Sequence, residues 1–246
     1  MHALSKMTWV ELKLFLREPA AVFFTLAFPV MVLLLFSSLF GNQPVRGFPD
    51  LRTVDVMAPA YTGMVIGTTA LLGLPIILAG YRQQGILRRL RATPLHPATI
   101  LTSQVLVNLL MTILGIALLI ATAFFVYDLR LPESPLSVAL AFVIATLSFF
   151  ALGFVLAGLM PSARTAQIVG QVLFFPMFFL SGAAGIPREM FPDTLRRISD
   201  FLPLTYVVEL IQDLWIKGSW NLTALAVLLG LLILSVVISS RTFRWE

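Results

Sequence analysis

Six long stretches of the chain are almost wholly apolar, and short polar segments separate them. They lie at about residues 20–40, 59–80, 99–127, 136–160, 166–182 and 221–240. An α-helix needs about 20 apolar residues to cross the roughly 30 Å of hydrocarbon in a bilayer. Each stretch reaches or approaches that length, the fifth being the shortest. The pattern therefore predicts six transmembrane helices.

The first 19 residues have a different pattern. In a helix the basic residues would share one face and the large apolar residues would spread over the opposite side: Lys6, Lys13 and Arg17 against Trp9, Leu12, Phe15 and Leu16. Such a helix suits the headgroup layer of the inner leaflet, so we expect an interfacial helix over 1–19. The same charges would also suit a simple topology anchor, and both interpretations stay open.

The segment 183–216 is too polar to span and too regular to be an unstructured loop. Pro192 and Asp193 suit a helix start, and apolar residues recur every three or four positions beyond Pro203. We expect short helices at the outer membrane face, either re-entrant or lying flat. Non-spanning backbone at membrane depth must be shielded by protein or line a cavity. The segment is therefore expected to cap or gate something.

The composition is typical of a membrane protein, and the distribution of charged residues predicts its orientation in the membrane. Hydrophobic residues make up 59% of the chain and charged residues only 12%, against about 25% in soluble domains, and cysteine is absent. With the N-terminus inside, ten of the 17 basic residues but only three of the 12 acidic residues lie on the inner side. Both termini are then cytoplasmic, and none of the charged residues falls within the six apolar stretches.

The densest basic cluster lies between the second and third stretches, in YRQQGILRRLRATPL at 81–95. A short helix is expected there, ending before Pro94 because the residue before proline disfavours the α region. Membrane topology alone explains basic residues on the inner side. A docking surface for a partner is the other interpretation.

The chemistry that the sequence lacks narrows the function. Ion-coupled carriers keep charged residues inside the membrane, and nucleotide hydrolysis requires a phosphate-binding loop such as G-x-x-x-x-G-K-[ST]. The three lysines follow Ser, Leu and Ile, and the chain has only two histidines. These absences disfavour a proton or ion carrier, an ATPase and a metal-dependent membrane enzyme. A pore or carrier driven by a separate protein fits better, and we expect that protein to bind the 81–98 loop.

Three stretches together resemble a known family. They are the LREPAAVFF sequence that begins at Leu16, the R-x-x-G-x-L-x-x-L-x-x-T-P pattern within 81–95, and the segment 178–215 with its P-L-T-Y element. In order and spacing the chain resembles the membrane (permease) subunit of a type 2 ABC exporter. This is the kind that bacteria use for drug resistance, sodium extrusion, or lipid or polysaccharide export.

The resemblance implies an all-α integral membrane fold: a single type 2 transmembrane domain over 1–246 with the 1–19 interfacial helix, an 81–98 coupling loop and the 183–216 outer segment. It also implies that the coupling loop inserts into a separate ABC ATPase through Arg82, Gln83, Gly85, Leu87, Arg88, Arg89, Leu90 and Pro94. Family members often carry acids around this glycine, where the chain has Gln83, Gln84 and Arg88, so the charge pattern of the contact differs.

The implied partners follow from the same resemblance. The lipid membrane, the ATPase, and a second copy or a sister permease are expected, and nucleic acid is not. The chain itself would need no cofactor and catalyse nothing, because ATP and Mg²⁺ would bind the ATPase. The expected location is the cytoplasmic membrane of a bacterium or archaeon, as a multi-pass protein.

The expected function is outward transport of a hydrophobic drug-like or lipid-type substrate. Polar residues within the spans could face its path: Thr62, Thr68, Thr69, Asn108 and Gln171. Hydrogen bonding between packed helices is the other explanation for them. Gly63-x-x-x-Gly67 is a spacing that favours close helix packing. A stand-alone channel or facilitator, or export of polysaccharide or sodium by the same architecture, remains an alternative.

Overall fold

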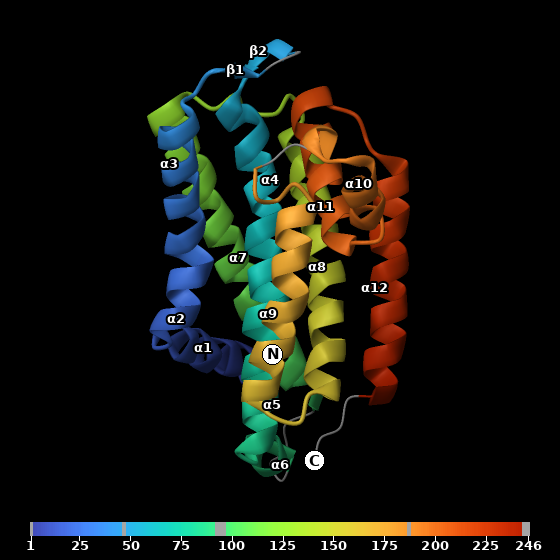
Figure 1. The fold of residues 1–246 in the computed structure, drawn as a ribbon. Helices are drawn as coiled ribbons and strands as arrows, with labels where there is room; N and C mark the ends of the chain where they lie inside the picture. The colour runs from blue at the N-terminus through green and yellow to red at the C-terminus, as the bar shows by residue number, and fades with distance from the viewer. Residues whose placement is uncertain (1, 46–47, 92–96, 186–187, 243–246) are drawn as a thin grey trace.

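The chain folds as a bundle of long, roughly parallel helices with smaller elements at both ends (Figure 1). The computed structural model describes residues 2–45, 48–91, 97–185 and 188–242. Five helices are long and apolar enough to cross a membrane by length and composition: Thr53–Gln83, Thr99–Tyr127, Pro135–Leu159, Ala163–Leu180 and Leu222–Arg241. A shorter apolar helix covers Phe23–Leu39. The predicted all-α membrane fold is confirmed.

The first two spans are continuous helices with a π-helical turn in each. The first runs through α2 (Pro19–Val22), η1 (Phe23–Ala27) and α3 (Phe28–Phe40). The second runs through α4 (Thr53–Gly67), η2 (Thr68–Gly73) and α5 (Leu74–Gln83). Between the two spans, β1 (Pro44–Val45) pairs antiparallel with β2 (Phe48–Arg52). The remaining spans are α7 (Pro97–Tyr127), α8 (Pro135–Leu159), α9 (Ala163–Leu180) and α12 (Leu222–Thr242).

The second helix is longer than the sequence pattern indicates, starting at Thr53 rather than near 59. Its first turn holds the buried Asp55, whose carboxylate accepts the backbone N–H of Arg52 and that of Arg130, both at 2.9 Å. These two donors compensate the loss of water around the charge and satisfy a free N–H at the helix start. The expectation that charged residues stay outside the spans therefore holds for 59–80 but not for the whole helix.

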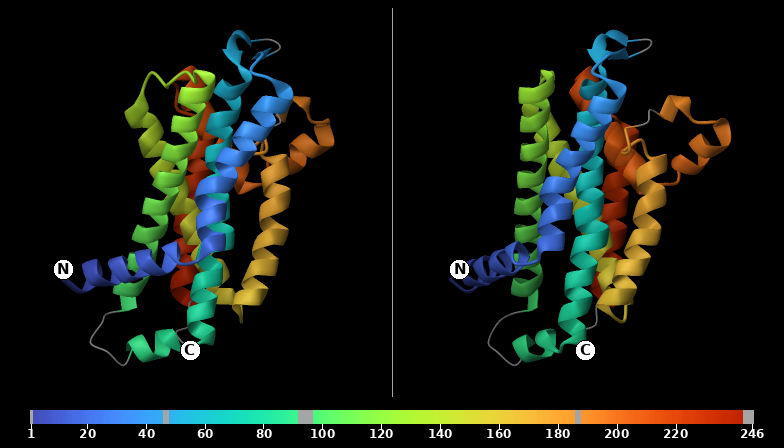
Figure 2. Two further views of the ribbon diagram at one scale, coloured as in Figure 1. Left: turned by 90° about the vertical axis from the view of Figure 1, so that its left-hand side faces the viewer. Right: turned by 60° about the vertical axis from the view of Figure 1, so that its left-hand side comes forward.

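The elements outside the spans divide between the two ends of the bundle (Figures 1 and 2). Helix α1 (His2–Leu16) lies across one end, and α6 (Ile86–Arg91) projects from that end, where α12 also finishes. The strands and α10 (Asp193–Ser199) lie at the other end. The excess of basic residues assigns the end with α1 and α6 to the cytoplasm.

The segment after the fifth span is re-entrant. It comprises η3 (Arg188–Met190), α10, α11 (Pro203–Gln212) and η4 (Asp213–Lys217). Helix α11 packs against α4 and α12, and Leu204, Val207 and Leu210 are fully buried. The guanidinium of Arg188 pairs with Asp200 and Glu209, which fastens the start of the segment to α11.

The second span is the central helix, and its π-helical turn is contacted through glycines. About 72% of its most apolar window is buried, against 17% for α9 and for α12. A Cβ atom at Gly153 of α8 would lie 2.3 Å from the Ala70 carbonyl oxygen, and one at Gly170 of α9 would lie 2.3 Å from that of Leu71. Only glycine permits both helices to approach the η2 backbone so closely.

Gly153→Ala should therefore lower thermal stability, because the added methyl collides with a backbone oxygen rather than with a flexible side chain. Overpacking of this kind costs about 1–3 kcal/mol. Gly230→Ala is the matched control, since a Cβ there meets nothing within 4 Å. Melting of the detergent-purified variants checks both; equal melting temperatures for Gly153→Ala and the parent would contradict the packing.

Candidate functional site

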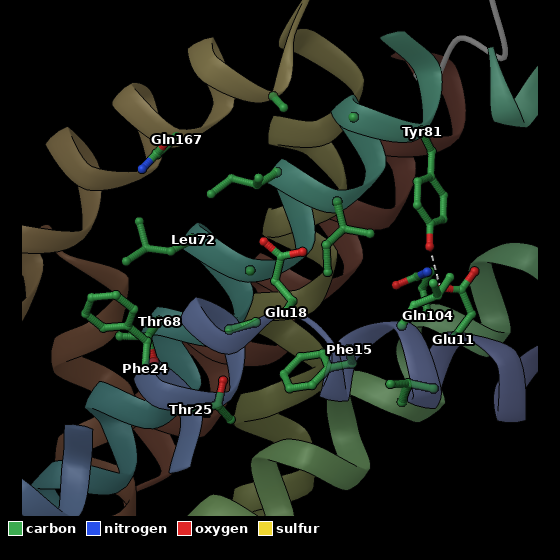
Figure 3. Close-up of a pocket in the computed structure, with 18 of the residues that line it drawn as sticks. Glu11, Phe15, Glu18, Phe24, Thr25, Thr68, Leu72, Tyr81, Gln104 and Gln167 are labelled. Atoms are coloured by element: carbon green, nitrogen blue, oxygen red, sulfur yellow. Dashed lines mark hydrogen bonds between the residues drawn. The ribbon is translucent and has the colours of Figure 1, made fainter. Parts of the chain in front are cut away.

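A cavity of about 580 Å³ lies between α1, the first span, α5, α7 and α9. Its walls have mixed chemistry, and Figure 3 shows the labelled side chains that line it. The polar and charged lining residues are Glu11, Arg17, Glu18, Thr25, Thr68, Tyr81, Gln84, Gln104, Gln167 and Gln171. Aromatic rings come from Phe15, Phe24 and Phe175.

Helical periodicity explains how two walls are built. On α9 the lining residues are Ala163, Gln167, Gln171 and Phe175, spaced four apart and hence on one face. On the second span they are Thr68, Leu72, Gly73, Ile76, Ile77, Gly80, Tyr81 and Gln84, which again recur at three and four positions. The wall on the second span begins in the π-helical turn and continues to the inner end of α5.

A hydrogen bond joins α1 to α5 at the inner end of the cavity. The Tyr81 hydroxyl donates to Glu11 Oε2 at 2.6 Å, and Glu11 is only 4% exposed. Burial raises the pKa of the Glu11 carboxyl above its usual 4.5, and the Tyr81 hydroxyl and the neighbouring Gln104 amide offset part of that rise. The interfacial helix is thus tied to the second span by a buried carboxyl group.

The apolar side of α1 supports this contact. Phe15 packs with Val107 and Met111 of α7, and Leu12 lies against the same cluster. On the exposed side, the ammonium of Lys13 lies 5.1 Å from the centre of the Trp9 ring. Helix α1 is therefore held by packing on one side and presents cationic and aromatic groups on the other, as an interfacial helix requires.

The expected docking residues surround the sharp turn between α5 and α6. Gly85 has a φ of +67°, which allows the chain to turn out of α5 into α6 without strain. The Gly85 N–H donates to the Arg82 carbonyl at 3.0 Å, and Arg89 Nη2 donates to the Gln84 carbonyl at 3.2 Å. Leu87 is 1% exposed and anchors α6 from its apolar side.

Two of these residues bind the α8–α9 connection. Arg82 Nη1 donates to the Gly158 carbonyl at 3.3 Å, and Gln83 Oε1 accepts the Ala163 N–H at 3.3 Å. Arg88 and Leu90 lie in α6. Pro94 lies outside the residues that the structure describes. The base of α6 is therefore fixed to two further spans.

The five polar residues proposed for a substrate path divide into two groups. Thr68 and Gln171 line the cavity, whereas Thr62, Thr69 and Asn108 do not. The threonine hydroxyls donate to carbonyls of their own helix, to Pro59 at 2.6 Å and to Val65 at 3.0 and 2.9 Å. Asn108 Nδ2 donates to the Gln104 carbonyl at 2.9 Å.

The glycine pair of the second span faces neighbouring helices of the same subunit. A Cβ at Gly63 would lie 2.9 Å from Val208 Cγ2 of α11, and one at Gly67 would lie 2.8 Å from the Phe174 ring of α9. The re-entrant helix and the fifth span both gain their close contact with α4 here.

Sequence reasoning missed the polar groups at the inner end of the cavity: Glu11, Glu18, Tyr81 and Gln104. A signal for one of them was present. Glu11 lies on the side of α1 opposite the basic stripe and beside Phe15. Glu18 follows the last residue of α1, Leu16, so helical periodicity does not place it. An acid on the apolar side of an amphipathic helix indicates a specific buried partner. Tyr81 and Gln104 carry no comparable pattern.

The pKa of Glu11 predicts a pH-dependent stability. Because the folded pKa is raised above the unfolded value, the contribution of Glu11 is fully present below about pH 4.5 and is lost as pH rises through the folded pKa. From pH ~7.5 to pH ~5, the melting temperature of the parent should rise relative to that of Glu11→Gln. Glu133→Gln, at an exposed position of the α7–α8 connection, controls for the change in net charge. A parallel pH profile for the parent and Glu11→Gln would contradict the burial of a titrating carboxyl.

Comparison with known proteins agrees with this architecture. The chain is 27% identical over 205 residues to "Putative transport permease YvfS" of Bacillus subtilis (strain 168), covering 82% of the chain and 81% of that protein. It is 29% identical over 215 residues to "Putative transport permease ycf38" of Porphyra purpurea, covering 84% of the chain and 72% of that protein. The profile of the family described as ABC-2 type transporter matches residues 2–215. With α1, the spans up to α9 and the re-entrant segment as far as residue 215 inside that match, the chain belongs to the ABC-2 type transporter family and is a membrane-embedded permease subunit.

Proposed function

We propose that the chain is the permease of an ATP-driven exporter, with a separate ABC ATPase docked on α6. The observation that carries the proposal is the position of α6. This short cationic helix projects from the inner end of the bundle (Figures 1 and 2) and continues, after one turn at Gly85, from the helix that forms a wall of the cavity.

A movement of α6 would be transmitted to the cavity through the adjoining helix α5. Helix α5 is stiff and carries Ile76, Ile77 and Tyr81 into the cavity wall. The contacts of Arg82 with Gly158 and of Gln83 with Ala163 couple the same region to α8 and α9. A displacement of α6 on ATP binding to the partner would therefore move α5 and α9, two walls of the cavity, together.

The energy source is a partner because the sequence offers no phosphate-binding loop. ATP and Mg²⁺ bind the ATPase, and the arginines of α6 meet it in place of the acids that related loops often carry. A second copy or a sister permease completes the transporter. Phe24 and Phe175 at the side of the cavity are 45% and 48% exposed, so one subunit encloses it incompletely.

The substrate class follows from the cavity. Leucine, isoleucine and phenylalanine side chains dominate the part nearest the spans, which suits a hydrophobic drug-like or lipid-type molecule. Movement is outward, from the cytoplasmic leaflet of a bacterial or archaeal cytoplasmic membrane. The re-entrant α11 closes the bundle at the opposite end.

Reconstitution with the cognate ATPase tests the proposal. A P-loop ATPase encoded beside this reading frame should co-purify with the permease, and hydrophobic substrates should stimulate ATP hydrolysis in liposomes. ATP hydrolysis by the permease alone would contradict the proposal that a separate subunit hydrolyses ATP. Solute flux across liposomes that contain the permease but no ATPase would show that the protein acts as a channel rather than as an exporter.

Charge reversal on α6 should separate docking from folding. The Arg88→Glu/Arg89→Glu variant should lose most co-purifying ATPase and substrate-stimulated hydrolysis, because the net charge of α6 changes from basic to acidic. Its melting temperature should stay near that of the parent, since among the described residues exposed Arg89 donates to the nearby Gln84 carbonyl and to no other element. Arg196→Glu/Arg197→Glu on exposed α10 makes the same charge change at the outer end and should leave both readouts intact. Full co-purification of the α6 variant would place the docking surface elsewhere.

A further inference from the structure

We propose that the cavity selects hydrophobic cations, through the carboxylates of Glu11 and Glu18, the unpaired amide of Gln104 and the aromatic side chains around them. This inference rests on the proposed function and names the substrate class of the same cavity. The ligand is an amphiphile with a cationic group, a hydrogen-bond acceptor near that group and an apolar aromatic or aliphatic body.

The charges of the cavity come from one segment. Glu11 lies in α1 and Glu18 in the link between α1 and α2, and both line the cavity together with Arg17. Figure 3 shows the Glu18 carboxylate pointing into the space between the N-terminal segment and α5. Glu18 forms neither a hydrogen bond nor an ion pair through its side chain with the residues that the structure describes, so its charge is available to a ligand. Arg17 is exposed, and its long side chain can extend to the headgroup layer.

The position of these carboxylates strengthens their effect. They lie at the inner end of a partly enclosed cavity whose remaining walls combine apolar side chains with uncharged polar ones. The attraction between opposite charges rises as the local dielectric constant falls below that of water. A cation that enters the cavity gains this attraction chiefly from Glu18, whose carboxylate has no partner among the described residues, while Glu11 shares its charge with the Tyr81 hydroxyl and exposed Arg17 is the basic residue of the lining.

Gln104 provides an independent observation. Gln104 is 2% exposed and lines the cavity, and its Nε2 has no acceptor at hydrogen-bond distance among the described residues, although the amide lies close enough to Glu11 to lower the pKa of that carboxyl. Asn108 Nδ2 lies 3.5 Å from Gln104 Oε1, which favours the orientation that leaves Nε2 free. A buried donor without an acceptor costs free energy, and a ligand acceptor would recover it. This unsatisfied group indicates a polar ligand atom close to Glu11.

The aromatic rings match the rest of such a ligand. Phe15, Phe24, Phe175 and Tyr81 line the cavity, and the face of an aromatic ring attracts a cation within about 6 Å. The volume of about 580 Å³ lies within the range that holds drug-sized molecules. A neutral lipid would use the apolar walls but leave the carboxylates without a counter-charge.

Direct binding to the purified permease tests this selectivity. Rhodamine 6G is a hydrophobic cation with ester and amine groups, and fluorescein ethyl ester shares its xanthene ring and ester without the positive charge. Fluorescence anisotropy in phosphatidylcholine nanodiscs, corrected against empty nanodiscs, measures both. The parent should bind rhodamine 6G at least about tenfold more tightly than the fluorescein ester, which corresponds to about 1.4 kcal/mol.

Glu18→Gln should weaken rhodamine 6G binding about tenfold, whereas binding of the fluorescein ester, which is anionic at neutral pH, should not weaken. The variant should fold, because Glu18 is exposed and is not held by an ion pair in the described structure. Glu18→Arg should reverse the preference between the two dyes. Glu133→Gln at the outer end makes the same charge change as Glu18→Gln and should bind like the parent.

Equal rhodamine 6G affinities for the parent and Glu18→Gln, or equal affinities of the parent for both dyes, would overturn the proposal. So would an unchanged dye preference in Glu18→Arg. Size-exclusion profiles and melting temperatures confirm that each variant is intact. The assay contains neither the ATPase nor ATP, so its failure leaves co-purification and substrate-stimulated hydrolysis as separate tests of the proposed function.

Discussion

The structure depends on one constraint: three helices must approach the backbone of the central span closely, because little else specifies their packing in lipid. In a bilayer apolar side chains gain little by leaving the hydrocarbon, so close van der Waals contact between helices carries more of the association. Gly153 allows α8 to reach the carbonyl of Ala70, and Gly170 allows α9 to reach that of Leu71. Gly63, on the central span itself, allows the third helix, α11, to pack closely there. The π-helical turn at 68–73 is therefore held on two sides.

This packing determines where the protein is open. The second span is covered by α8, α9 and α11 along most of its length, but the face of α5 towards α1 and the first span borders the cavity. Under the proposed docking on α6, a displacement of α6 would act first on α5, α8 and α9 at the inner end, where Arg82 and Gln83 bind Gly158 and Ala163.

Polar side chains cluster at the inner end of the central helix, where it leaves the apolar core. Glu11, Tyr81 and Gln104 come from three elements and meet at the inner end of the cavity, with Glu18 nearby. A carboxyl group in such a place costs desolvation energy, and burial raises the pKa of Glu11 accordingly. The proposed selection of cationic ligands would give these carboxyl groups a role beyond stability.

The sequence by itself determined the spans and the family resemblance, predicted the orientation, and marked 183–216 as short helices that do not span, either re-entrant or lying flat, because each leaves a local pattern of apolar, basic or motif residues. It also indicated that Gly63 and Gly67 occupy a packing face. Only the tertiary structure decided that Asp55 is buried inside a span helix, that Thr68 and Gln171 line the cavity while Thr62, Thr69 and Asn108 do not, and that Glu11 meets Tyr81. These facts depend on contacts between residues up to 75 positions apart. Helical periodicity fixes the face on which a residue lies, but the rotation and crossing of the helices decide what that face meets.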